Sequence, residues 1–193
     1  MANSTVSEIQ VSQSTISGAV LRAPSGTPLP SDASTALNAA FKNLGHIGQE
    51  GITWARDVAT EDVKDMNGAT LRTVQTDFSK SFTAPFLQSR NEDLLNAIFG
   101  DANVAVTAAT VSSGRIVTFS DQGRVSEQAP IVIETVDGDA VKRTLVSFSQ
   151  VTQVEEGPWV GSAVQQFTVT FSAYPDESGN YSTTWDDDGE FSA

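Results

Sequence analysis

Between residues 73 and 87, apolar and polar side chains alternate along the chain. Five apolar side chains stand at even positions, namely Val74, Phe78, Phe82, Ala84 and Phe86, and the odd positions from 73 to 83 are all polar. This alternation is typical of a β-strand with one face toward a core, because successive side chains point to opposite sides of a sheet. Thr76 and Lys80 interrupt the apolar series, and a straight strand of this length would extend ~50 Å, beyond the usual range. We therefore expect a strand that either bends at a bulge or projects from the body of the protein.

The dipeptide Asn67-Gly68 precedes this strand. Asn-Gly favours a two-residue type I′ turn, because both central positions of that turn need a positive φ. The sequence therefore predicts a hairpin in which residues 60–66 pair with residues 69–77.

A helical period replaces the alternation in two short segments. In residues 31–44, apolar side chains recur every three or four positions: Ala33, Ala36, Leu37, Ala40, Phe41 and Leu44. Ser31 or Asp32 would cap this helix at its start and Gly45 at its end.

The second helix is predicted over residues 91–99. Asn91 is a favourable N-cap, acidic residues follow in the first turn, and Gly100 ends the pattern. We expect Leu94, Leu95 and Ile98 to pack on a sheet as the apolar stripe of this helix.

The remaining segments indicate strands separated by turn residues. They are residues 15–23, which precede a proline-rich stretch, and residues 104–111, 115–120, 131–136, 141–151 and 164–174, with a hairpin turn at Asp137-Gly138. Together these elements predict a mainly β fold, an antiparallel β-sandwich or barrel with one or two short flanking α-helices. We expect a flexible N-terminal arm over residues 1–14, the sandwich domain over residues 15–175, and an acidic C-terminal arm or disordered tail over residues 176–193.

Composition argues against catalysis and against a DNA-gripping surface. The chain has no cysteine and a single histidine, His46, so it lacks a nucleophile–base arrangement and we expect no enzymatic activity and no cofactor. The run Asp186-Asp187-Asp188-Gly189-Glu190 lacks the spacing of a calcium loop, and no metal site is expected. The net charge of −13 with 11 basic residues fits either an ordinary acidic protein or a surface that repels DNA. Without a signal peptide or an apolar span, the chain is expected to be cytoplasmic at synthesis and not to bind a membrane.

The succession of these pieces resembles the tail tube proteins of siphophages, in particular those of phages that infect actinobacteria. The resemblance covers about residues 18–105 and is carried by these stretches: Gly26-Thr27-Pro28-Leu29-Pro30, Asn38-Ala39-Ala40-Phe41, Leu44-Gly45-His46-Ile47, Glu50-Gly51-Ile52, Thr73-Val74-Gln75-Thr76, and residues 91–100 with the closing Phe99-Gly100-Asp101. It implies a non-enzymatic subunit of the virion tail, assembled in the host cytoplasm into hexameric rings that stack into a conduit for double-stranded DNA. It also implies contacts with the tape measure protein and with tail terminator and initiator proteins. A capsid decoration protein, an adhesion or carbohydrate-binding module and a β-rich hydrolase are the alternatives.

Within a tube, the hairpin at Asn67-Gly68 and the long strand after it are the best candidates for the channel wall. Their acids, Glu61, Asp62, Asp65 and Asp77, would then face the lumen and keep DNA mobile by repulsion, without specific binding. Two alternatives stay open from the sequence: the hairpin lies on the outside, or some of these acids pair with Lys64 or Arg72.

Overall fold

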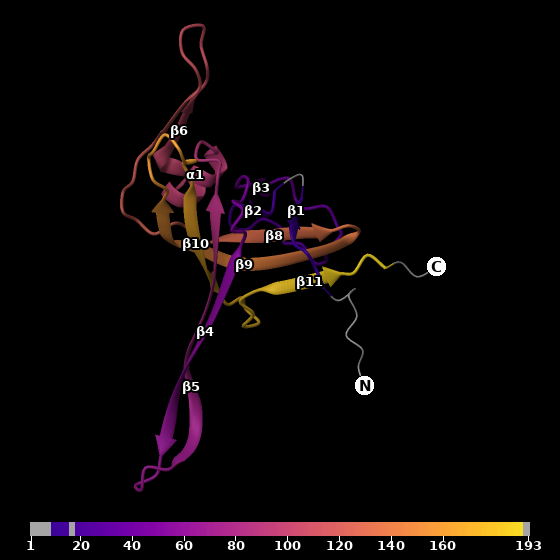
Figure 1. Ribbon diagram of the computed structural model, residues 1–193, viewed down its shortest axis with the longest axis vertical. Coiled ribbons are helices and arrows are strands. Elements are labelled where there is room, and N and C mark those ends of the chain that lie inside the picture. The colour runs from indigo at the N-terminus through magenta and orange to yellow at the C-terminus, as the bar shows by residue number, and fades with distance from the viewer. Residues whose placement is uncertain (1–8, 16–17, 191–193) are drawn as a thin grey trace.

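The computed structural model describes residues 9–15 and 18–190 and consists mainly of antiparallel strands (Figure 1). The strands are β1 Gln13–Ser14, β2 Val20–Arg22, β3 Lys42–Asn43, β4 Thr53–Lys64, β5 Thr70–Phe86, β6 Val104–Thr107, β7 Ile116–Phe119, β8 Ala129–Asp137, β9 Ala140–Glu156, β10 Phe167–Tyr174 and β11 Thr183–Asp187. The helices are α1 Glu92–Phe99 and a short 3-10 turn at Asp101–Asn103. The predicted fold class, mainly β with a flanking helix, is confirmed.

One large sheet contains nine of these strands, in the order β3-β2-β8-β9-β10-β5-β4, with β1 added to β8 and β11 added to β9. Strand β9 belongs to both halves of the sheet. Strand β8 pairs with one edge of β9, whereas β11 pairs with the first part of its other edge and β10 with the remaining part. In Figure 1, β8, β9 and β11 run across the view, whereas β10, β5 and β4 run along the long axis. The sheet therefore turns through the bend in β9, where the register with β10 shifts between Thr170 and Phe171. Strands β6 and β7 form a separate hairpin at the opposite end of the molecule from the tip of β4 and β5.

Helix α1 covers the main core, as the sequence predicts. The side chain of Asn91 accepts hydrogen bonds from the backbone N–H groups of Asp93 (2.9 Å) and Leu94 (3.4 Å), which satisfies donors that a helix start leaves unpaired. Leu94 and Leu95 are fully buried and Ile98 is nearly so. They pack against apolar side chains of β2, β5, β8, β9 and β10.

The predicted helix over residues 31–44 is wrong: the segment forms bends and turns that end in β3. The carboxylate of Asp32 accepts hydrogen bonds from the backbone N–H groups of Ser34 (2.9 Å) and Thr35 (2.5 Å) and from the Thr35 hydroxyl, a local pattern that competes with a helix. Arg143 of β9 binds the backbone carbonyls of Asp32 and Thr35, which a helix would use internally. The apolar side chains instead cover the second face of the sheet. This second core contains Leu21, Ala23, Phe41, Val132 and Leu145, with Leu37, Ala40 and Trp185 against it.

The turn between β4 and β5 also differs from its prediction. Gly68 has φ 85, but no described non-glycine residue has a positive φ, so a type I′ turn is excluded. The Gly68 N–H donates to the Asp65 carbonyl (3.1 Å) and the Asp65 N–H donates to the Ala69 carbonyl (2.9 Å). The loop is thus longer than two residues and needs only one glycine in the left-handed region.

The chain after β10 continues the sheet. Thr183–Asp187, which the sequence places in an acidic arm or disordered tail, form β11 and pair with Val141–Leu145 of β9. At the other end, Gln13 and Ser14 of the expected arm pair with β8, while residues 1–8 of that arm lie outside the described residues.

Candidate assembly surface

Strands β4 and β5 leave the body of the protein as a long two-stranded ribbon (Figure 1). Every residue of β4 is exposed, and β5 becomes buried only near its C-terminal end. Strand β10 pairs with β5 only from Lys80 to Phe86, so the ribbon beyond Lys80 has no strand on either side among the described residues. The sequence left open whether this long strand projects from the body or bends at a bulge. It projects, and it also contains a bulge, because the β4–β5 register shifts between Ala59 and Thr60.

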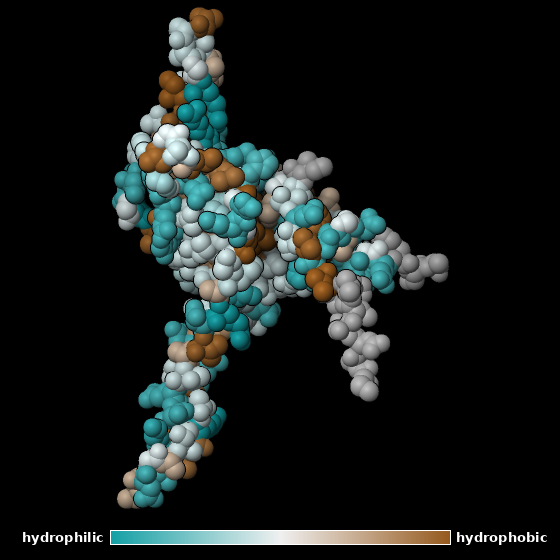
Figure 2. All heavy atoms as spheres, viewed as in Figure 1, coloured by the Kyte–Doolittle hydropathy of each residue, from teal (hydrophilic) through white to brown (hydrophobic). Residues whose placement is uncertain are grey.

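The ribbon carries exposed hydrophobic side chains at intervals along its length. They are Trp54, Val58, Val63, Met66, Leu71 and Val74. Figure 2 shows brown hydrophobic residues between teal polar ones along this projection. An isolated two-stranded hairpin is only marginally stable in water, and unpaired strand edges invite pairing with another chain. The exposed apolar side chains and unpaired strand edges of this ribbon are therefore features of a surface that binds another protein chain.

Aromatic and cationic side chains alternate at the base of the ribbon. Across the β4–β5 pair, Trp54 stands opposite Phe82, Arg56 opposite Lys80 and Val58 opposite Phe78. The Lys80 ammonium lies 5.0 Å from the centre of the Trp54 ring, and the Arg56 guanidinium lies 5.2 Å from the centre of the Phe78 ring.

Residues just before β11 close this cluster. The ring of Phe78 packs edge-on against Tyr181, with 4.6 Å between ring centres. Lys80 Nζ donates a hydrogen bond to the hydroxyl of Ser182. Burial and, to a smaller extent, the positive charge of Arg56 lower the pKa of the Lys80 ammonium. We call Trp54, Arg56, Phe78, Lys80 and Tyr181 the cation–aromatic patch.

This patch was not identified from the sequence. The only signal was that Lys80 interrupts an otherwise apolar series, since a lysine on a core-facing strand position needs polar or aromatic partners for its ammonium group. Its neighbour Arg56 lies on a different strand, so the pairing register alone brings the two cations together.

The four acids predicted to face a channel lie on the exposed part of the ribbon or in its turn. Asp62 accepts a hydrogen bond from the Thr73 hydroxyl (2.7 Å), and Glu61 stands opposite Val74. Asp65 caps the turn, because its carboxylate accepts from the backbone N–H groups of Asn67 (2.9 Å) and Ala69 (2.8 Å).

Asp77 stands farther from the tip and accepts a hydrogen bond from the backbone N–H of Phe78 (2.8 Å). Within residues 9–15 and 18–190, neither Lys64 nor Arg72 forms an ion pair with any of the four acids. The structure therefore brings Glu61, Asp62 and Asp65 together near the tip and leaves Asp77 closer to the base.

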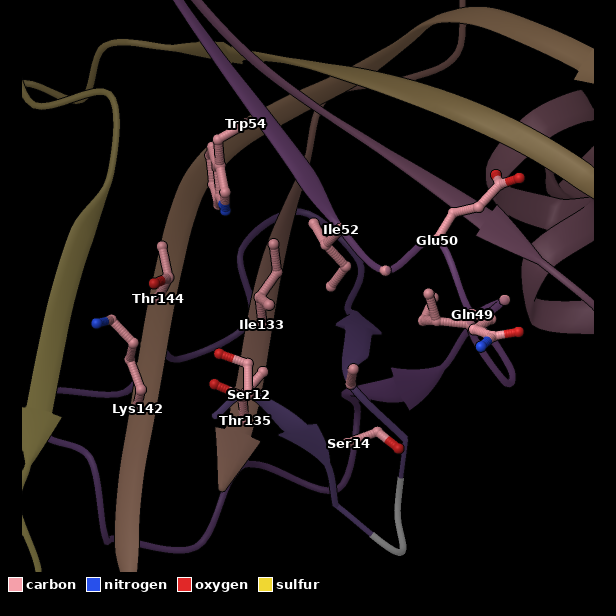
Figure 3. A pocket seen from close by; sticks show the side chains of 14 residues that line it. Ser12, Ser14, Gln49, Glu50, Ile52, Trp54, Ile133, Thr135, Lys142 and Thr144 are labelled. Carbon is pink, nitrogen blue, oxygen red and sulfur yellow. The ribbon is translucent and has the colours of Figure 1, made fainter. Parts of the chain in front are cut away.

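A groove of about 540 Å³ lies between the start of β4 and the β8–β9 pair (Figure 3). Ile52 and Trp54 form one side, and Ile133 lies on the other. The polar groups around it include Glu50 and Lys142, and Lys142 Nζ is engaged by Asp186 (2.6 Å). The groove thus contains hydroxyl, ammonium and carboxylate groups without a histidine or cysteine to form a nucleophile–base pair.

The single histidine, His46, is not among the residues that line this groove. His46 is exposed, and its backbone carbonyl accepts a hydrogen bond from Leu87. In the part of the chain that the structure describes, no three His, Cys, Asp or Glu side chains are grouped so as to hold a metal ion. Nor does any described helix have the length and apolar character needed to cross a membrane.

A model of the family described as phage tail tube protein matches residues 10–189, nearly the whole chain. The chain belongs to the phage tail tube protein family. Its role is therefore structural rather than enzymatic, in agreement with the missing nucleophile–base pair, and it is a component of the virion tail.

Two solved structures are similar to this tail tube protein over most of its length. One is the tube terminating cap of the anti-feeding prophage, with 11% identity and a TM-score of 0.43 over 92% of this chain and 94% of that chain. The other is from the sheath–tube complex of an extracellular contractile injection system in its extended state, with 9% identity and a TM-score of 0.44 over 94% of this chain and 98% of that chain. No curated protein matches the chain by sequence.

Proposed function

We propose that this protein is the repeating subunit of the tail tube, and that its copies form hexameric rings that stack around a channel for double-stranded DNA. The observation that supports ring formation best is the pair of unpaired strand edges. Strand β4 has no partner on its outer edge among the described residues. At the far side of the same group of strands, β8 stops pairing with β9 at Ser149, and the Val151 N–H donates to the Ser126 hydroxyl (3.0 Å). The outer edge of residues 152–156 then has no strand beside it among the described residues.

The strand directions at these two edges are compatible with a closed ring of identical copies. The group β9-β10-β5-β4 has an even number of antiparallel strands, so its first and last strands run in opposite directions. When neighbouring copies are related by rotation about the tube axis, β4 of one copy meets β9 of the next in an antiparallel arrangement. Closing the ring then pairs the free end of β9 with part of β4, which reduces the aggregation hazard of the isolated subunit.

The net charge of −13 suits a channel for DNA. A basic wall would hold the phosphates by counterion release, whereas an acidic wall repels them over a Debye length of ~8 Å at physiological salt. In this proposal the ribbon lines the lumen with the face that carries Glu61 and Asp77, and Asp65 lies in the turn at its tip. Asp62, the neighbour of Glu61 on β4, stands on the opposite face, the one that continues into the core at Phe82. The tail is that of a siphophage with an actinobacterial host, and the tape measure, terminator and initiator proteins are the further partners.

Electron microscopy of the purified protein tests this function. We expect tubes or stacked rings with six copies per ring and an axial channel. Compact particles or small oligomers at high protein concentration would contradict the proposal and favour a capsid decoration protein or an adhesion module.

A further inference from the structure

The cation–aromatic patch is an unusual concentration of positive charge in a strongly acidic protein. Arg56 and Lys80 stand directly opposite one another on two paired strands, an arrangement of like charges that destabilises a sheet. Among residues 9–15 and 18–190, neither forms an ion pair with a carboxylate. Asp57, the acid next to Arg56 in sequence, stands opposite Ser79 at the alternate position of the strand. The isolated subunit thus leaves two neighbouring cations uncompensated.

The complementary charge lies at the far end of β11. Asp186 is bound to Lys142 (2.6 Å), but the carboxylates of Asp188 and Glu190 are exposed and have no cationic partner among the described residues. The backbone of this segment is ordered by the Asp188 carboxylate, which accepts from the Glu190 N–H (3.0 Å). We call residues 186–190 the acidic end.

The acidic end does not reach the patch of its own chain. Ser182 contacts Lys80 at the start of β11, and from there Thr183–Asp187 are held by β9 in a strand that leads away from the ribbon. A five-residue strand spans ~17 Å, more than a side-chain ion pair can bridge. The two opposite charges therefore occupy opposite ends of the same strand, and only a second copy satisfies both.

We propose that the acidic end of one copy binds the cation–aromatic patch of the neighbouring copy in the same ring. The contact joins two different surfaces, so each copy donates an acidic end on one side and accepts one on the other. Heterologous contacts of this kind form closed rings when the rotation between copies closes. The aromatic rings beside the two cations hold them in place by cation–π contacts, and a hydrogen bond between ionised groups is stronger than one between neutral groups. This inference rests on the proposed tube function, because it assigns a lateral contact of the ring.

A charge swap tests the contact in the full-length chain. We expect Arg56→Glu and Glu190→Lys each to raise the protein concentration needed for tube formation by about tenfold or more at low salt, with a smaller effect at high salt. Glu190 is chosen because the Asp188 carboxylate orders the backbone of the acidic end. The double variant restores the charge pair in reversed order and should recover most of the loss. Arg90→Glu and Glu177→Lys are the matched controls, since both side chains are exposed and outside the two surfaces. Circular dichroism and melting of each variant establish that it is folded.

Cross-linking provides a second readout, because the protein has no cysteine of its own. Arg56→Cys and Glu190→Cys chains are mixed, assembled and treated with a short bismaleimide. Efficient linkage of the mixture, above that of either variant alone, is the expected result. Tubes that form without this linkage, or single swaps that assemble like the original chain, overturn the inference but leave the tube function intact. Failure of the original chain to form tubes contradicts the proposed function itself.

Discussion

Arg143 is a charged side chain inside the sheet, only 4% exposed. Its guanidinium binds the Glu134 carboxylate on the neighbouring strand. It also donates hydrogen bonds to the backbone carbonyls of Asp32 (2.8 Å) and Thr35 (2.8 Å). One residue thus neutralises a half-buried acid and fixes the segment that covers the second core. Burying such a charge is costly unless every donor has a partner, and here the partners are supplied by two separate parts of the chain.

Replacing Arg143 should be among the most destabilising single changes in this protein. Arg143→Met keeps much of the side-chain volume but leaves Glu134 and two carbonyls without their partner, and we expect a loss of roughly 3–5 kcal/mol in the free energy of unfolding. Denaturant unfolding of the monomer measures it. The Arg143→Met, Glu134→Gln double variant removes the orphaned charge and should recover part of the loss. A loss below about 1 kcal/mol for Arg143→Met would mean that the buried network contributes little.

At the scale of elements, α1 and the ribbon contrast in how they are held. Helix α1 is short, so its stability comes from burial of its apolar stripe rather than from helix propensity. The ribbon has no such burial beyond its base and depends on its own ladder of hydrogen bonds. Helix α1 is therefore part of the folded body, whereas the ribbon is available to a partner.

Truncating the apolar stripe tests the docking of the helix. We expect Leu95→Ala to lower the free energy of unfolding by roughly 2–5 kcal/mol, because Leu95 is fully buried and the helix cannot collapse into the space. Glu92→Ala is the control, since it removes only an exposed ion pair with Arg115 and should cost under about 1 kcal/mol. Equal melting of the Leu95→Ala variant and the original chain is the outcome that contradicts docking.

Shortening the ribbon separates folding from assembly. Thr60 and Gln75 pair across the ribbon, so residues 61–74 can be replaced by an Asn-Gly turn that joins them. The removed part contributes no side chain to either core, and we expect the melting temperature of the monomer to change little. Electron microscopy should then show that tubes no longer form. Normal tubes from the shortened chain would contradict a role for the ribbon in assembly.

At the scale of the whole molecule, charge has two opposing effects. In the proposed channel, the net charge of −13 favours release of DNA but makes subunits repel one another, so the assembly needs local attraction between copies. Paired strand edges and the proposed contact at the cation–aromatic patch would provide it. The same balance predicts that the acids of the ribbon act on DNA rather than on folding.

Reversing charge on the ribbon tests this role. We expect Glu61→Lys with Asp77→Lys, which share one face of the ribbon, to leave tubes intact and to slow genome ejection from virions, because a basic wall retains phosphates. The delay should shrink as salt is raised. Asp65 is better left unchanged, since its carboxylate caps the turn. Glu177→Lys, on an exposed loop, provides a control with the same change of charge. Unchanged ejection at low salt, with tubes that carry the substitutions, places these acids outside the channel.

The sequence by itself determined the elements whose signals are local. Alternation predicted the long strand of Phe78 and Phe82, the cap at Asn91 predicted α1, and Asn67-Gly68 placed the tip of the ribbon, because neighbouring residues alone create these patterns. The succession of motifs also indicated the tail tube family.

Tertiary structure decided what depends on partners distant in sequence. Residues 31–44 have a helical spacing but cover a sheet without forming a helix, because Arg143 takes the carbonyls that a helix would need. The acidic segment at Thr183–Asp187 is a strand because β9 offers an edge. The register of β4 and β5 places Arg56 opposite Lys80, a juxtaposition that no periodicity encodes, since side chains on different strands meet only once the sheet has formed.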